Sequence, residues 1–181
     1  YAIAKISGIK MCEYYNKQYN TNFTSLISTN VFGPNDNYDL NSSHFLPALI
    51  RKIYEAKINK KKYINLWGDG KAKRELIYVD DLAEAAIYFL FKKSKNNYIN
   101  IGTQKDFTVE YYARKIMQLL DVKLNIKYIK RDLKGTPRKL LDSTIANNLG
   151  WRPKVKIEKG IELTINDFIK NYKEYSKKTK N

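Results

Sequence analysis

A tyrosine and a lysine four residues apart open the chain, at Tyr1 and Lys5. Residues spaced i, i+4 share one face of a helix, and an ammonium group beside a phenol favours the tyrosinate form. Such a pair can donate or accept a proton near neutral pH. The same spacing occurs twice more, at Tyr88/Lys92 and at Tyr111/Lys115. Spacing alone therefore leaves a solvated helix face as the competing interpretation of each pair.

A few other residues could bind or protonate a ligand. His44, the single histidine, is a candidate proton donor because imidazole titrates near neutral pH. Arg74 follows the turn Gly68-Asp69-Gly70 and could bind an anion, and Trp67 precedes that turn. The competing interpretations are a structural histidine, a surface arginine and a core tryptophan. Asp80-Asp81 resembles a catalytic carboxylate pair, but the apolar run behind it predicts that Asp80 caps a helix.

The glycines exclude one common cofactor motif. None of the eight forms Gly-x-Gly-x-x-Gly between a strand and a helix. The chain therefore contains no recognisable dinucleotide-binding half, and we expect no turnover with a nicotinamide cofactor from the chain by itself.

Apolar periodicity and capping residues predict alternating helices and strands, which is typical of an α/β domain. We expect helices over residues 1–19, 45–57, 82–91, 109–120, 144–150 and 157–169. We expect strands over residues 23–32, 63–67, 76–79, 98–101 and 124–129. The first helix carries Ile3, Ile6, Ile9 and Cys12 on one stripe, which predicts a buried face with Cys12 in the core. It begins without a cap, which favours a chain cut from a longer one, and residues 171–181 are expected to form a basic, frayed tail.

Composition narrows the function classes. The 34 Lys and Arg outnumber the 18 Asp and Glu, giving a net charge of +16, but only six are Arg and no nucleic-acid recognition motif accompanies them. The longest apolar run, residues 85–91, is far shorter than the roughly 20 residues of a membrane span. One cysteine cannot form an internal disulfide. We expect a cytoplasmic protein with neither a nucleic-acid nor a membrane partner, and no metal site.

An ordered series of motifs runs along nearly the whole chain. It comprises Tyr1-Ala2-Ile3-Ala4-Lys5, Ser28-Thr29-Asn30-Val31-Phe32-Gly33-Pro34, Ser43-His44-Phe45-Leu46-Pro47, Trp67-Gly68-Asp69-Gly70, Arg74-Glu75-Leu76-Ile77-Tyr78-Val79-Asp80-Asp81, Asn100-Ile101-Gly102 and Gly135-Thr136-Pro137-Arg138. The series resembles the extended short-chain dehydrogenase/reductases that act on nucleotide sugars. It is most similar to the members that epimerise and then reduce a GDP-4-keto-6-deoxymannose with NADPH.

The resemblance implies a fold and its division. It implies the last part of a Rossmann-type parallel sheet, with the Tyr-x-x-x-Lys helix and the following strand over residues 1–33. Residues 34–170 would be mainly a smaller substrate-binding α/β lobe, with segments that return to the sheet. Family members are commonly homodimers that pack the Tyr-x-x-x-Lys helix.

The resemblance also implies site residues. Tyr1 would protonate the sugar oxygen during reduction, Lys5 would hold the nicotinamide ribose and support Tyr1, and His44 would be the epimerisation acid. The segment along NADP(H) would include Ser28, Thr29, Asn30 and Val31, with Lys5 and His44 also contacting the cofactor. The GDP-sugar would contact Lys52, Trp67 and Arg74, where Lys52 replaces the usual arginine and cannot form a bidentate fork.

The resemblance begins at the family's catalytic tyrosine, so the half that carries the catalytic serine and the epimerisation base has no counterpart here. Two alternatives stay open. One is another epimerase or dehydratase of the same superfamily with a UDP or dTDP sugar. The other is a nucleotide-sugar-binding module without catalysis.

Overall fold

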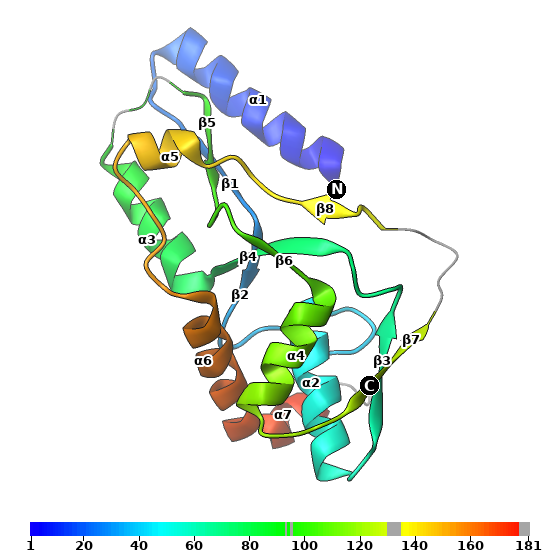
Figure 1. The fold of residues 1–181 in the computed structure, drawn as a ribbon. Helices are drawn as coiled ribbons and strands as arrows, with labels where there is room; N and C mark the ends of the chain where they lie inside the picture. Colours follow the sequence, from blue (N-terminus) through cyan, green and yellow to red (C-terminus); the bar gives the residue numbers. More distant parts are fainter. Residues whose placement is uncertain (93, 95, 130–134, 178–181) are drawn as a thin grey trace.

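The computed structural model describes residues 1–92, 94, 96–129 and 135–177, and it has an α/β fold. Figure 1 shows α1 at one end of the molecule, with α2, α4, α6 and α7 gathered toward the other. The helices are α1 (Ala2–Tyr19), α2 (Phe45–Ile58), α3 (Val79–Leu90), α4 (Val109–Leu119), α5 (Thr144–Asn148), α6 (Ile157–Lys170) and α7 (Tyr172–Lys177). The strands are β1 (Ser25–Ser28), β2 (Asn30–Phe32), β3 (Tyr63–Trp67), β4 (Lys73–Tyr78), β5 (Tyr98–Ile101), β6 (Asp106–Thr108), β7 (Asn125–Ile129) and β8 (Arg138–Lys139).

The described strands form three small sheets that are mostly parallel. β1 pairs with β5 and β3 pairs with β7, both in parallel. β4 pairs in parallel with β2 and β8 and antiparallel with β6, so it is the strand on which the four-stranded sheet is built. Parallel pairs need crossover connections, and α2 lies in the connection between the paired strands β2 and β4.

Two apolar clusters stabilise this arrangement. The larger lies among α2, α4 and α6 and includes Ile53, Ile116 and Phe168, all fully buried. The smaller includes Ile99 of β5 and Trp151, which packs beside Phe89 of α3. Trp151 also donates from its indole nitrogen to Glu84 over 3.0 Å. The predicted division after Gly33, between the Rossmann-type part and the substrate-binding lobe, stays a prediction.

Most predicted elements match the structure, and the differences have physical causes. The predicted strand 23–32 is interrupted at Thr29, whose hydroxyl donates to the backbone oxygen of Glu75 instead of continuing one ladder. β4 begins three residues before the predicted strand, because its polar first half pairs with β6 and β8. Asp80 is not the cap of α3: the cap position is Tyr78, and Asp80 lies in the first turn.

The ends of the chain differ most from expectation. The predicted apolar stripe of α1 is not buried, since none of its side chains is buried and Ile3 is 79% exposed. Cys12 is only partly covered, so its assignment to the core is wrong. The predicted frayed tail is also wrong over α7, whose Tyr175 hydroxyl donates to Asp167 over 2.9 Å. Residues 178–181 of that tail lie outside the described residues.

Within the described ranges, every helix is too short or too polar to cross a bilayer.

Candidate functional site

The tyrosine and lysine that open the chain lie together at the start of α1. The Lys5 ammonium lies 5.4 Å from the centroid of the Tyr1 ring, and the Tyr1 side chain is fully open to solvent. The tyrosines of the two other pairs have hydroxyl groups with structural partners: Tyr88 donates to the Leu149 oxygen over 2.8 Å, and Tyr111 donates to Glu158 over 3.2 Å. Among the described residues, the Tyr1 hydroxyl has no hydrogen-bond partner. Of the three tyrosine–lysine pairs, Tyr1/Lys5 is therefore the one whose tyrosine hydroxyl is exposed and able to bind a ligand.

The residues assigned to the cofactor lie at the ends of β1 and in β2. Ser28 is exposed, and Val31 is partly covered within β2. The Thr29 hydroxyl and the Asn30 amide both donate to the backbone oxygen of Glu75, over 3.0 and 3.4 Å. Both side chains thus contact β4, and the Thr29 hydroxyl oxygen and the Asn30 carbonyl oxygen can still accept a hydrogen bond.

His44 occupies the N-cap position of α2, and its side chain is exposed. It makes no capping hydrogen bond, so a purely structural role as a cap is excluded. It interacts electrostatically with the carboxyl group of Asp36. Burial raises the pKa of the Asp36 carboxyl, and the charge of His44 acts against that rise. One oxygen of Asp36 is buried and finds no hydrogen-bond partner in the described part of the chain.

Lys52 and Trp67 lie together although fifteen positions separate them. The Lys52 ammonium is 4.4 Å from the centroid of the Trp67 ring, within the range of a cation–π contact. Trp67 is 49% exposed, so the interpretation as a core tryptophan is wrong. A base that stacks on this indole must use the ring face opposite Lys52, or displace the ammonium.

Arg74 lies on β4 and is partly buried, and its backbone pairs with Lys139 of the neighbouring strand β8. Its guanidinium donates to the Lys73 oxygen over 2.7 Å, and a Cβ built on Gly135 would lie 3.8 Å from the guanidinium. Arg138 of the same segment pairs with Asp106 over 2.5 Å. This hydrogen bond from Arg138 is the main reason that the pKa of Asp106 is lowered. Arg74 is thus held between two strands, with no carboxylate paired to it among the described residues.

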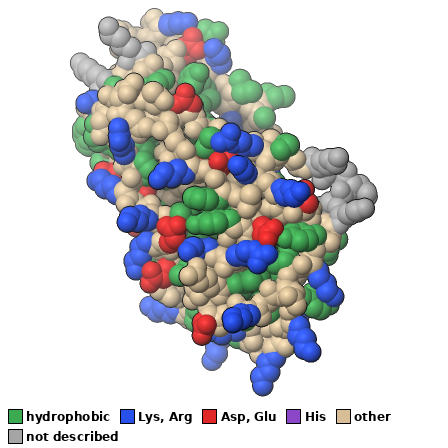
Figure 2. Space-filling view, in the orientation of Figure 1, with side chains coloured by type: hydrophobic (Ala, Val, Ile, Leu, Met, Phe, Trp, Pro, Cys, Tyr) green, Lys and Arg blue, Asp and Glu red, His purple; other side chains and the backbone are tan. Residues whose placement is uncertain are grey.

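The predicted residues form separate groups. No hydrogen bond, ion pair or ring contact joins Tyr1 to His44 within the described ranges. Those ranges also contain no cluster of three or more His, Cys, Asp or Glu placed to hold a metal. Figure 2 shows Lys and Arg side chains spread over one face and interspersed with acidic ones, rather than gathered in a stripe.

A cavity of about 490 Å³ lies elsewhere, lined by residues that include Phe107, Lys105, Arg152 and Ile157. None of the predicted site residues lines it. We place the candidate site at the predicted residues, because no Lys–Tyr contact like that of Lys5 and Tyr1 is found within the cavity lining among the described residues.

Sequence reasoning did not anticipate that two carboxylates of the run 74–81 are buried. Glu75 and Asp81 are 0% and 3% exposed, and each accepts hydrogen bonds from backbone N–H groups. The sequence does place both acidic residues beside apolar ones in the run 74–81, which is a sign of burial. Only the fold shows which backbone amides bind each carboxylate.

Comparison with known proteins agrees with the motif series. The model of the NAD dependent epimerase/dehydratase family matches residues 1–102. A GDP-L-fucose synthase of Sinorhizobium fredii is 42% identical over 171 residues, which are 94% of this chain and 54% of that protein. The chain thus spans about half the length of the curated relatives it matches.

Solved structures show the same fold. A GDP-mannoheptose C4 reductase of Campylobacter jejuni with NADP bound superposes with a TM-score of 0.79 at 31% identity, over 92% of this chain and 59% of that one. A GDP-L-fucose synthetase of Naegleria fowleri superposes with a TM-score of 0.85 at 25% identity, over 96% of this chain and 55% of that one. With more than half of its residues matched by the family model, the chain belongs to the NAD dependent epimerase/dehydratase family.

Proposed function

We propose that the chain is the carboxy-terminal part of a GDP-L-fucose synthase, an enzyme that epimerises GDP-4-keto-6-deoxy-D-mannose at C3 and C5 and reduces it at C4. The observation that carries the proposal is the 42% identity with a GDP-L-fucose synthase over 94% of the chain. The position of Tyr1 and Lys5 on one exposed helix face supports it.

The chemistry follows from the acidity of protons beside a ketone. Their removal gives a delocalised enolate, and a proton returned to the other face inverts the carbon. We assign the return of that proton to His44. Tyr1 stabilises the developing negative charge on O4 by hydrogen bonding, and during reduction it transfers its phenolic proton to that oxygen. The Lys5 ammonium stabilises the tyrosinate that remains.

NADP(H), when bound, supplies the hydride for C4. The residues present fit such a group: Lys5 is exposed beside Tyr1 and can reach a ribose hydroxyl, and the side-chain oxygens of Thr29 and Asn30 can still accept hydrogen bonds. We assign Lys5, His44 and residues 28–31 to the cofactor. The phosphate-binding turn is not among the 181 residues.

We assign the GDP group to Arg74, Trp67 and Lys52. A diphosphate is a strong acceptor for a guanidinium, and Arg74 has no carboxylate partner in the described ranges. We further propose a cytoplasmic homodimer in which the exposed apolar side chains of α1, such as Ile3 and Ile6, pack against the partner.

Titration calorimetry of the chain with GDP tests the proposal. Replacement of Arg74 by Ala should weaken binding by about 1.5–3 kcal/mol, the usual value of a hydrogen bond to a charged group. The control is Arg152→Ala, because Arg152 is exposed beside the separate cavity. Equal losses in both variants would show non-specific attraction of an anion to a basic protein and would contradict the proposal.

Two further measurements separate the alternatives. UDP should bind more weakly than GDP, and the reverse order would favour a UDP-sugar enzyme of the same family. The DNA upstream of the Tyr1 codon distinguishes an enzyme from a binding module. A reading frame there that encodes a glycine-rich phosphate-binding turn supports the enzyme.

A further inference from the structure

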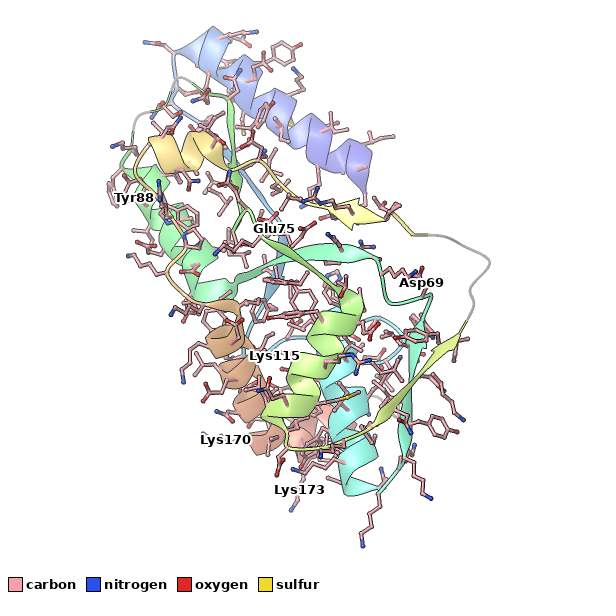
Figure 3. The ribbon with its side chains drawn as sticks, viewed as in Figure 1. Asp69, Glu75, Tyr88, Lys115, Lys170 and Lys173 are labelled. Atoms are coloured by element: carbon pink, nitrogen blue, oxygen red, sulfur yellow. The ribbon has the colours of Figure 1, made fainter. Side chains whose placement is uncertain are left out.

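Glu75 is the most deeply buried charged side chain among the described residues, at 0% exposure. It lies on β4 directly after Arg74, and Figure 3 labels it near the middle of the molecule. A carboxylate in such a place is costly unless hydrogen bonds satisfy it. Glu75 therefore needs partners on both of its oxygens.

Three backbone amides provide them. The N–H groups of Thr103 and Gln104 donate to Oε1 over 2.6 and 2.7 Å, and the N–H of Leu141 donates to Oε2 over 2.7 Å. The two oxygens thus join two segments far apart in sequence: the turn after β5 and the end of the segment that contains β8. We call this arrangement the Glu75 clamp.

The second of these segments lies beside Arg74 in the same sheet. The Lys73 amide donates to the Pro137 oxygen over 2.8 Å, and Arg74 is paired with Lys139 across β4 and β8. Gly135 lies next to the Arg74 guanidinium, and Leu141 of the clamp ends the segment on the other side. Neighbouring residues on a strand point to opposite faces. Glu75 therefore acts on Arg74 through the segment that pairs with β4 beside it, and not by pairing with its charge.

We propose that Glu75 is a positioning residue for anion binding: its clamp holds residues 135–141 in the place that sets the direction of the Arg74 guanidinium. The proposal rests on the proposed function, in that it takes the anion to be the diphosphate of GDP. A guanidinium discriminates by geometry as well as by charge, so an unfixed Arg74 would keep its attraction but lose its aligned hydrogen bonds.

Glu75→Gln tests the clamp with almost no change of volume. A glutamine has one acceptor oxygen and one NH₂ donor group, so it can satisfy either the Thr103 side or the Leu141 side, and its NH₂ then faces an N–H. The matched control is Asp81→Asn. Asp81 is 3% exposed and accepts the amides of Lys154 and Val155, over 2.9 and 3.1 Å, in a clamp of the same kind away from Arg74.

The measurement is the affinity of the folded chain for GDP, with the unfolding midpoint of each variant recorded beside it. Both variants should lower stability, but only Glu75→Gln should weaken GDP binding, by about tenfold, which corresponds to about 1.4 kcal/mol. Equal GDP affinity in Glu75→Gln and Asp81→Asn would overturn the proposal and leave Glu75 with a purely structural role.

A second measurement on the unmodified chain covers the case in which Glu75→Gln does not fold. Coupling between two sites is reciprocal, so if the fixed segment favours GDP, bound GDP must fix the segment. Saturation with GDP should slow hydrogen exchange at the Leu141 amide, but not at the amides of Lys154 and Val155. Unchanged exchange at Leu141 would overturn the proposal.

The outcomes also separate this inference from the proposed function. If Arg74→Ala binds GDP like the unmodified chain, the assignment of the diphosphate to Arg74 fails, and the role of Glu75 fails with it. If Arg74→Ala weakens binding while Glu75→Gln does not, the proposed function stands and only the role of Glu75 is wrong.

Discussion

Replacement of Gly102 by Ala tests how rigidly the Glu75 clamp is held. Gly102 follows β5 and is buried, and a Cβ built there would lie 2.4 Å from Glu75 Oε1 and 3.1 Å from Ser143 Oγ. Glu75 cannot retreat, because the amides of Thr103, Gln104 and Leu141 hold both of its oxygens. The methyl group must therefore displace the backbone or break a hydrogen bond to the carboxylate.

The expected cost follows from these two effects. Overpacking of a well-filled core costs about 1–3 kcal/mol. Weakening one hydrogen bond to a charged group costs up to about 1.5–3 kcal/mol. The two costs do not add in full, because breaking the hydrogen bond relieves part of the overlap. We therefore expect Gly102→Ala to lower the free energy of unfolding by about 2–4 kcal/mol. Urea denaturation followed by circular dichroism measures it.

Gly8→Ala is the matched control. Gly8 lies within α1, and a Cβ built on it meets no atom within 4 Å. The same substitution should therefore stabilise the chain by about 0.5–1 kcal/mol, the helix preference of Ala over Gly. If Gly102→Ala is as stable as the unmodified chain, the carboxylate can move at little cost and the reasoning about a fixed clamp is refuted.

Three more predictions follow from the site. The hydrogen bond from Arg138 lowers the pKa of Asp106, so this ion pair stabilises the fold above the unfolded pKa of about 3.9 and stops doing so as the pH falls through the folded pKa. Arg138→Ala should therefore lower the free energy of unfolding at pH 7, and the loss should become smaller in acid. A loss of stability that does not change with pH would contradict this prediction. In the complete protein, His44→Asn should slow epimerisation by about 10²–10⁴ while reduction changes less. Deuterium uptake from solvent beside the ketone, followed by NMR, measures this step, and normal uptake would assign His44 a non-catalytic role. The purified chain should consume no NADPH with the keto sugar, since it has no phosphate-binding glycine turn, and measured turnover would overturn that expectation.

Local sequence patterns determined most of the secondary structure. The helix cap at Thr108 was predictable because its hydroxyl can accept the amide of Tyr111, three residues away, and it does so over 3.0 Å. The strand Tyr63–Trp67 was predictable from its alternating residues, which the structure buries at alternate positions. Motif order along the chain was likewise enough to indicate the family, because it depends on which residues follow one another and not on how they pack.

Tertiary structure decided the features that depend on distant partners. Helical periodicity in α1 predicts a buried stripe, but burial needs a second surface, and the described residues provide none for Ile3 or Ile6. Of three identical Tyr/Lys spacings, the fold distinguishes Tyr1 because it gives the hydroxyl groups of Tyr88 and Tyr111 partners 61 and 47 positions away. In the sequence, Glu75 cannot be distinguished from the other acidic residues. Its proposed positioning role depends on the backbone amides that the turn after β5 and the Leu141 segment bring to its carboxylate. Such contacts join residues that no local pattern links, so the sequence by itself could not have predicted them.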